Sequence, residues 1–389
     1  MKEKLNIWFR RTLMLMAFFM FLILSSCIDE YWPEVNKYEN LIVVEGGITN
    51  EAGPYTIKIS KSSPIDSSAY IPYPNCTITI SDDNGSIEIL QEVTDGEYQT
   101  SIDGIHGEIG RKYKLTISTP DSKVYESDYE ELKKPVLIED VYAEVEYHDD
   151  GAYDHTLAGY QFYLDTETTA DTNFYLWQME ATFHFQSDFN IRWYYDGRVR
   201  PFNPSDSLFN CWTTYKIRDL YTFNTTSLQN DQLVKFPLNY VNTEDRHLTI
   251  KYSLLVKQNT ISKKAFQFWD AIKEQNADQG SLYSHQPYQI RGNIRNIDND
   301  EEPVLGYFMV SGVDSKRIFV DRIDAPFYFT KCSINDGNYM AYAEIGWTDP
   351  VYYPVYVILY DNNRAVPGQP CADCRQKNGS INKPEFWED

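Results

Sequence analysis

The chain has 389 residues, of which 57 are acidic and 35 are basic, so its formal net charge at pH 7 is −22. This excess of acid argues against nucleic acid as a partner, because phosphates are bound by patches of Lys and Arg. With 42% hydrophobic and 15% aromatic residues the chain can bury substantial cores, which excludes general disorder. Its length predicts about two domains.

The chain opens with a positively charged segment, followed by residues 13–24, which carry no polar side chain. A permanent transmembrane helix needs about 20 apolar residues, so we expect residues 1–26 to be a signal peptide. The run ends in Leu24-Ser25-Ser26-Cys27, the form of a lipoprotein signal. We therefore expect a lipid on Cys27 that anchors the chain to a membrane, with residues 27–37 as a linker. The alternative is an ordinary secretory signal that happens to end near a cysteine.

Residues 38–134 hold about seven short runs typical of β-strands, separated by turn residues. Tyr55, Ile57 and Ile59 alternate with polar neighbours, which is the period of a half-buried strand. Asn84-Gly85 favours a tight hairpin turn. The spacing of runs and turns predicts an immunoglobulin- or transthyretin-like β-sandwich.

Residues 135–389 continue with longer alternating runs, of which 247–257 is the clearest. One helix is expected near 262–276, because Ser262 is a good N-cap. An apolar stripe follows the cap at helical spacing, formed by Ala265, Trp269 and Ile272. The prediction for this second domain is a larger β-sandwich or partly open barrel with one helix and a Cys-x-x-Cys tail. The fold class is thus mainly β.

Five cysteines follow Cys27, namely Cys76, Cys211, Cys332, Cys371 and Cys374. The last two form a Cys-x-x-Cys, which is compatible with half a zinc site, a redox pair or two disulfide partners. A zinc site would need a second ligand pair nearby, and a thioredoxin-type motif a βαβ context. Because exported chains meet an oxidising compartment, we expect Cys211 and Cys332 to bridge to Cys371 and Cys374. Cys76 is expected to be a buried thiol, and reduced structural thiols or a metal site are the alternatives.

The stretch RWYYDGR alternates flat aromatic rings with guanidinium groups, which can stack on sugars or peptide groups and bind carboxylates. The alternative is a strand with core-facing residues and a turn at Asp196-Gly197. The candidate ligand-binding residues are Arg192, Trp193, Tyr194, Tyr195 and Arg198.

Other motifs have simple structural explanations. The Asp-rich segment 148–155 and the acidic segment 298–302 resemble metal loops in composition, but turn chemistry and solvation explain them. Residues 206–208 fit a short O-glycosylation pattern. No nucleophile elbow, HExxH helix, P-loop or dinucleotide fingerprint occurs in the sequence. We expect no catalytic residues, no metal and no cofactor, although paired carboxylates for glycoside hydrolysis stay open.

Three pieces of the second half resemble a known family: Gly292-Asn293-Ile294, Gly306-Tyr307-Phe308 and a tail that reads CADCRQKNGSINKPEFW. This order is similar to the Bacteroidota lipoprotein family called domain of unknown function 4249. The tail has Asn378-Gly379 where that family would show a glycine pair. The resemblance covers nearly all of the chain after the signal and brings no catalytic residues.

The resemblance implies a cell-envelope lipoprotein whose gene neighbours a TonB-dependent outer-membrane receptor. Acidic residues behind Cys27 also resemble a surface-export signal of that phylum. We therefore expect a lipid-anchored, surface-exposed outer-membrane protein that is an accessory or substrate-binding subunit of a TonB-dependent transporter. A structural lipoprotein that scaffolds other outer-membrane proteins is the first alternative, and a surface hydrolase the second. The sequence indicates no particular ligand.

Overall fold

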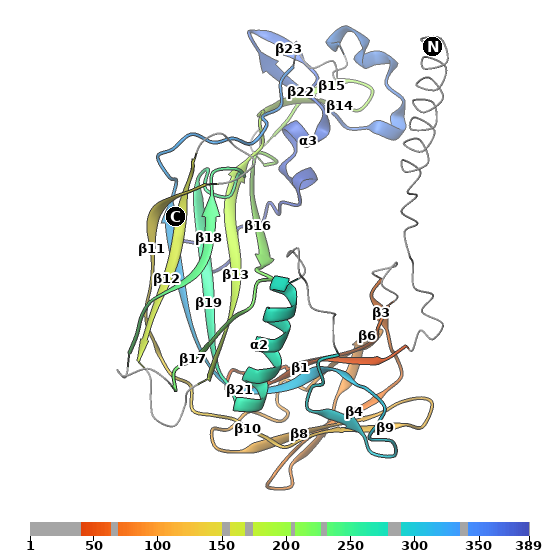
Figure 1. The fold of residues 1–389 in the computed structure, drawn as a ribbon. Coiled ribbons are helices and arrows are strands. Elements are labelled where there is room, and N and C mark those ends of the chain that lie inside the picture. The colour runs from red at the N-terminus through yellow and green to blue at the C-terminus, as the bar shows by residue number, and fades with distance from the viewer. Residues whose placement is uncertain are drawn as a thin grey trace, which may run out of the picture.

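The computed structural model describes residues 40–63, 69–149, 156–167, 174–203, 207–226, 232–278, 289–334 and 341–388. Their strands form four sheets, which close no barrel among the described residues (Figure 1). Three of the sheets build two sandwiches, and the four-stranded sheet stands apart from them. The mainly β fold class predicted from the alternating runs is confirmed.

The largest sheet has ten strands and runs through both halves of the molecule. In spatial order its main strands are β16 (Asn210–Lys216), β13 (Phe174–Gln186), β19 (Lys251–Thr260), β21 (Leu305–Asp321), β1 (Ile42–Thr49), β2 (Thr56–Lys61), β7 (Glu97–Gln99) and β6 (Gln91–Thr94). Two short strands pair beside this path, β17 (Tyr221–Asn224) with β13 and β3 (Ile71–Pro72) with β2.

The other three sheets are smaller. The six-stranded sheet contains β20 (Ile294–Asn296), β9 (Val124–Ser127), β8 (Lys112–Ser118), β4 (Thr77–Asp82), β5 (Ile87–Ile89) and β10 (Glu130–Glu131). The three-stranded sheet contains β11 (Ile138–Asp149), β12 (Thr156–Glu167) and β18 (Gln232–Asn242). The four-stranded sheet contains β15 (Val199–Pro201), β14 (Ile191–Tyr195), β22 (Val355–Tyr360) and β23 (Asn363–Ala365).

The N-terminal sandwich packs β1, β2 and β7 against the six-stranded sheet, around one apolar core. Tyr55, Ile57 and Ile59 point into this core and are almost fully buried, as their alternation predicted. The expected hairpin joins β4 to β5, where Gly85 adopts a φ of +93°. A φ in this range costs glycine little, because it has no Cβ.

The C-terminal sandwich packs the three-stranded sheet against β16, β13, β19 and the second half of β21. Its core contains Trp177, whose indole N–H donates to the buried Gln258 side chain at 2.9 Å. One side is closed, because Ile138 N of β11 donates to Asp314 of β21 at 2.7 Å. On the other side β18 and β16 are the last strands of their sheets, so the sandwich is open there.

Strand β21 joins the two sandwiches. Its first half pairs in parallel with β1, and its second half pairs antiparallel with β19. Strand β20 likewise pairs with β9, so residues 294–311 return to the N-terminal sandwich although the sequence placed them within 135–389. The close pairing depends on Gly306, where a Cβ would lie 1.9 Å from the carbonyl oxygen of Val44. Periodicity indicates such a strand but not its change of partner.

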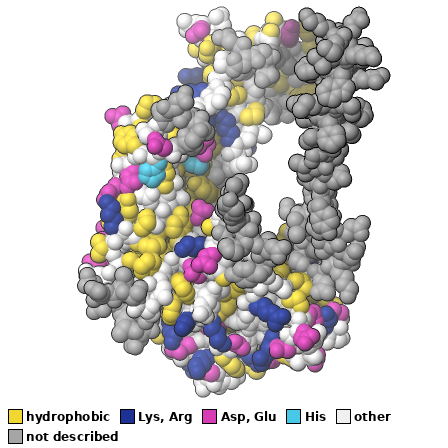
Figure 2. All heavy atoms as spheres, viewed as in Figure 1, with side chains coloured by type: hydrophobic (Ala, Val, Ile, Leu, Met, Phe, Trp, Pro, Cys, Tyr) yellow, Lys and Arg dark blue, Asp and Glu magenta, His cyan; other side chains and the backbone are white. Residues whose placement is uncertain are grey.

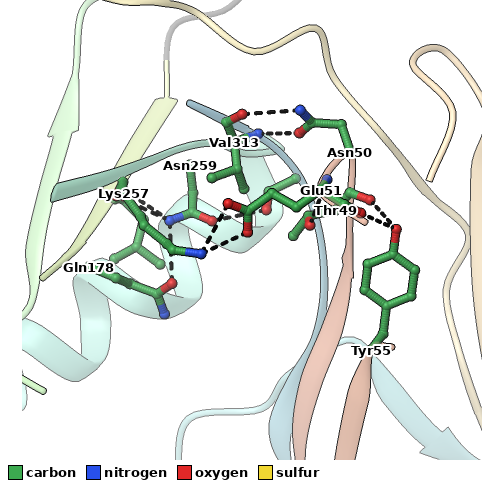
Figure 3. Close-up of polar contacts among 10 residues, drawn as sticks. Thr49, Asn50, Glu51, Tyr55, Gln178, Lys257, Asn259 and Val313 are labelled. Atoms are coloured by element: carbon green, nitrogen blue, oxygen red, sulfur yellow. Dashed lines mark hydrogen bonds and ion pairs between the residues drawn. The ribbon is translucent and has the colours of Figure 1, made fainter. Parts of the chain in front are cut away.

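Polar groups tie the two sandwiches together where β1 ends (Figure 3). The Asn50 side chain exchanges two hydrogen bonds with the backbone of Val313, at 2.5 and 3.1 Å. Beside it, Glu51 forms an ion pair with Lys257 of β19 at 2.8 Å. The amide of Asn50 thus continues the β1–β21 pairing by one step, beyond the last paired residue of β1.

The main helix, α2 (Lys263–Asp278), confirms the helix expected near 262–276. The hydroxyl of Ser262 accepts a hydrogen bond from Ala265 N at 3.1 Å, which is the predicted N-cap. The apolar stripe of the helix packs on β13 and β21, with Ala265 and Phe268 buried against Leu176 and Tyr307. The other helices of the described residues are short, namely α3 (Gln369–Ala372), η1 (Tyr342–Trp347), η2 (Pro350–Tyr352) and η3 (Cys374–Lys377).

Candidate functional site

A small lobe stands at one end of the C-terminal sandwich (Figure 1). It consists of the four-stranded sheet together with η1 and η2, and we call residues 189–203 and 341–368 the aromatic lobe. Strands β14 and β22 pair at its centre, and two small apolar clusters fill its faces. The lobe therefore has a packed interior, to which Leu208 and Ala372 contribute from the adjoining segments.

The structure places all five candidate ligand-binding residues in the aromatic lobe, on β14 and the turn that follows it. Trp193, Tyr194 and Tyr195 are half-buried and pack within the lobe, and the guanidinium of Arg364 lies 4.7 Å from the centre of the Trp193 ring. Arg192 and Arg198 are exposed. The rings thus help to build the lobe, while the two cations are available at its surface.

An exposed apolar patch on η1 and η2 was missed from the sequence. Trp347 is 84% exposed, Val351 75% and Tyr352 66%. Large side chains this exposed are informative, because contiguous apolar surface marks interaction sites. The sequence GWTDPVYYP contains a hint of this patch, because aromatic residues stand on both sides of an Asp-Pro step. It has no strand or helix periodicity, so the pattern did not show which of these residues are exposed.

Two disulfide bonds secure the lobe and the tail. Cys211 of β16 is bonded to Cys374, and Cys332 is bonded to Cys371, with Cα–Cα distances of 5.8 and 5.9 Å. Both members of the Cys-x-x-Cys are therefore used structurally. Cys76 is a free, buried thiol in the N-terminal sandwich, where burial raises its pKa to about 11.

Asp188 holds the base of the lobe through two cations from distant parts of the chain. Its carboxylate lies 2.8 Å from Arg246, in the loop after β18, and 2.8 Å from Lys377 of η3. Burial alone would raise the pKa of Asp188, but the hydrogen bonds and charges of Lys377 and Arg246 outweigh it and lower the pKa. Asp188 is therefore an ionised, buried junction between three segments.

The described residues of the two acidic segments, 148–155 and 298–302, make structural contacts within the chain. Glu302 accepts hydrogen bonds from Lys123 at 2.9 Å and from Tyr125 at 2.8 Å. His148 lies 2.8 Å from Glu146 and stacks on Tyr240, while residues 150–155 and 206 fall outside the described part. Within the described ranges no three His, Cys, Asp or Glu residues gather as a metal site would require.

A cleft of about 410 Å³ lies at the open side of the C-terminal sandwich. One wall is the end of β18, and the other is the segment after β16; we call this the edge cleft. Its lining residues are Tyr215, Lys216, Ile217, Arg218, Asp219, Asn239, Tyr240, Val241, Asn242, Asp245 and His247. His247 is largely buried, and burial lowers the pKa of its imidazole, so the ring is neutral at pH 7.

Charged side chains of both signs are interspersed over the N-terminal sandwich, at the bottom of the view in Figure 2. No helix in the described part has both the length and the apolar character to cross a bilayer. The expected signal peptide, lipidated Cys27 and linker 27–37 lie outside the described residues.

A family model described as Domain of unknown function (DUF4249) matches residues 28–317, about three quarters of the chain. The match contains the Gly292-Asn293-Ile294 and Gly306-Tyr307-Phe308 pieces and ends before the Cys-x-x-Cys tail. No curated protein matches the chain.

Proposed function

The chain belongs to the family described as Domain of unknown function (DUF4249), and we propose that this protein is a lipid-anchored outer-membrane binding subunit that docks on a TonB-dependent transporter. The family description names no activity.

The signal region supports the anchor. Residues 13–24 are too short to remain as a spanning helix, and they end at a lipoprotein-type Leu24-Ser25-Ser26-Cys27. Two or more acyl chains, at about 0.8 kcal/mol for each buried methylene, hold a protein on a membrane without any transmembrane helix. A protein attached in this way is confined to the layer in which outer-membrane barrels are embedded.

The exposed patch of the aromatic lobe is the observation that carries the docking role. Trp and Tyr are enriched in interface hot spots, because they offer large rigid contact areas at low entropic cost. Trp347 at the end of η1 and Tyr352 in η2 expose such side chains five residues apart in the chain, and Val351 beside Tyr352 adds exposed apolar surface. The disulfide between Cys332 and Cys371 ties the chain on either side of the patch, so docking does not have to order a free loop.

The test is co-purification from native envelopes. A tagged chain at its natural expression level is extracted gently, and its partners are quantified by mass spectrometry. We expect one TonB-dependent barrel in near-equal amount, and at least a ten-fold lower yield of it with a Trp347→Ser/Tyr352→Ser double variant. The matched control is Ile87→Ser, which removes an equally exposed apolar side chain (68%) from the N-terminal sandwich and leaves the yield unchanged.

A mixed set of assembly proteins instead of one barrel would favour the scaffold role. An unchanged barrel yield in the double variant would reject the aromatic lobe as the docking surface. The melting temperature of each variant shows whether the lobe still folds.

A further inference from the structure

Strand β11 has a free edge along most of its length. It is the outermost strand of the three-stranded sheet, at the left margin of the C-terminal sandwich in Figure 1, and it pairs with β12. Its start is held on β21, because Ile138 N donates to Asp314. From Asp140 to Asp149 the pairing with β12 runs without a register shift. Among the described residues, no strand pairs with the other edge of β11 over this length.

The core-facing side of the same part of β11 is uncovered. Val145 is paired with Tyr160 of β12, which packs against the core, so both side chains lie on the core face of the sheet. Tyr147 is likewise paired with the buried core residue Ala158. Yet Val145 is 49% exposed and Tyr147 65%, whereas Val141 on this face is buried. The core of the sandwich therefore ends in open apolar surface beside the free edge.

The facing sheet ends at the same side of the sandwich. Strand β1 pairs with residues 305–311 of β21, and the rest of β21 pairs with β19 alone among the described strands. The second half of β21 is thus an edge as well. Ile318 and Val320 point from it toward the core, because they are paired with core residues of β19. Both sheets therefore present apolar side chains where an additional strand beside β11 would lie.

The edges of β18 and β16 in this sandwich are interrupted or covered. In β18, Pro237 lacks a backbone N–H and Lys235 has a φ of +55°, so neither continues a regular ladder. On β16 the tail adds a bridge, in which the backbones of Trp212 and Ser380 exchange two hydrogen bonds at 2.8 Å. Such devices protect strand edges from unwanted pairing. The second half of β11 has neither a proline nor a bridge to the tail.

The charges on β11 define what can pair with it. Glu144 and Glu146 alternate with the core-facing residues and so lie on the solvent face. Lys235 lies 2.7 Å from Glu144 but reaches it from β18, on the side away from the free edge. A second copy of β11, paired antiparallel about Val145, would place Glu144 opposite Glu146, and like charges in this arrangement are destabilising. A strand with Lys or Arg at alternate positions would instead place cations beside both carboxylates.

We infer that the second half of β11 is a docking edge for a β-strand of another protein, in which basic residues alternate with apolar ones. The backbone of that strand continues the three-stranded sheet, its cations lie beside Glu144 and Glu146, and its apolar residues cover Val145 and Tyr147. This edge shares no residue with the aromatic lobe. The inference therefore goes beyond the proposed function and does not rest on it.

The test uses the full chain in detergent and three synthetic peptides that carry a fluorophore. KVKVKVK has the required alternation, KKKKVVV has the same composition without it, and EVEVEVE has the opposite charge. We expect KVKVKVK to bind at least ten-fold more tightly than either of the others, as measured by fluorescence anisotropy. Hydrogen exchange followed by mass spectrometry locates the peptide. The fast-exchanging amides of residues 142–149 should exchange at least ten-fold more slowly when KVKVKVK is bound.

Val145→Lys places a charge on the face that the added strand covers, so KVKVKVK should bind at least ten-fold more weakly. The melting temperature should change little, because Val145 is already half exposed. The matched control is Val234→Lys, the same change at a 62% exposed valine of β18, on the opposite edge of the same sheet. This variant should bind KVKVKVK as the wild type does.

The absence of KVKVKVK binding would overturn the inference, and so would equal binding of KKKKVVV, because net charge alone would then explain the affinity. Unchanged affinity in Val145→Lys would reject β11 as the site. Slow exchange of all amides of residues 142–149 in the free protein would also overturn the inference, since the edge would already be covered. Dependence of that slow exchange on protein concentration would identify the cover as a second copy, and independence would identify it as the chain itself.

Discussion

Asp188 shows how one side chain can join segments that are far apart in the chain. A single carboxylate, with 5% of its side chain exposed, receives Arg246 and Lys377, whose own side chains are only 18% and 23% exposed. Charge-assisted hydrogen bonds in such surroundings are stronger than those at an open surface. We therefore expect Asp188 to make a measurable contribution to the free energy of unfolding.

We expect Asp188→Asn to lower the free energy of unfolding at pH 7 by about 2 kcal/mol, because both ion pairs are lost and two cations are left partly buried. Urea denaturation measures the change. The control is Asp300→Asn in the exposed acidic segment, which should alter stability by less than about 0.5 kcal/mol.

The pH dependence follows from the lowered pKa of Asp188. Its stabilisation is fully present above the ordinary pKa of aspartate, about 3.9, and disappears as the pH falls through the lower folded value. Between pH 6 and pH 3 the wild type should therefore lose more stability than Asp188→Asn. Equal losses would show that this carboxylate does not couple to folding.

At the scale of elements, the pairing of β1 with β21 depends on backbone contact. Gly292, Asn293 and Gly306, which belong to the family-like sequence pieces, meet at this place. A Cβ on Gly292 would lie 1.8 Å from the carbonyl oxygen of Gly306, and the Asn293 side chain exchanges two hydrogen bonds with the backbone of Phe308. The residue types in these two pieces are therefore explained by the close approach of the segments around Gly292 and Gly306.

Gly306→Ala and Gly85→Ala form a matched pair, because both glycines have positive φ, +90° and +93°. At Gly85 an added Cβ meets nothing within 4 Å, so only backbone strain remains, about 1 kcal/mol. At Gly306 it meets the backbone of Val44, and we expect a loss above about 3 kcal/mol or failure to fold. Chemical denaturation measures both, and similar small losses would contradict the proposed steric role.

At the scale of the whole molecule, the disulfides hold the tail and lobe on the C-terminal sandwich. They close segments of very different length, because Cys211 and Cys374 are 163 residues apart and Cys332 and Cys371 are 39 apart. A cross-link restricts the unfolded chain more when it closes a longer loop.

The loop-entropy relation gives about 5 kcal/mol for the first bond and about 4 kcal/mol for the second. We therefore expect Cys211→Ser/Cys374→Ser to destabilise the protein more than Cys332→Ser/Cys371→Ser. The first pair also places polar groups in a fully buried site, which acts in the same direction. Denaturation of the two double variants under oxidising conditions gives the order, and the reverse order would contradict it.

The proposed anchor is tested by Cys27→Ala. Without a thiol no lipid can be attached, so the protein should leave the outer-membrane fraction. Immunoblots of separated membrane and soluble fractions show the distribution, with Cys76→Ala as the control that leaves membrane attachment unchanged. Full retention of Cys27→Ala in the outer membrane would reject the lipid anchor.

The sequence by itself determined the local elements and their faces. Alternation placed Tyr55, Ile57 and Ile59 in a core, and Ser262 with its apolar stripe located α2. Both follow from the periods of strands and helices, which are local properties of the chain.

Only the tertiary structure decided which distant segments meet. The change of partner along β21, the connectivity of the two disulfides and the opposite walls of the edge cleft all join residues far apart in sequence. A period shows which face of a strand is buried, but it carries no information about the neighbour across that face. That choice is made by packing. The ten-stranded sheet continues from one sandwich into the other through the pairing of β21 with β1, which is possible because Gly306 has no Cβ to collide with the backbone of Val44.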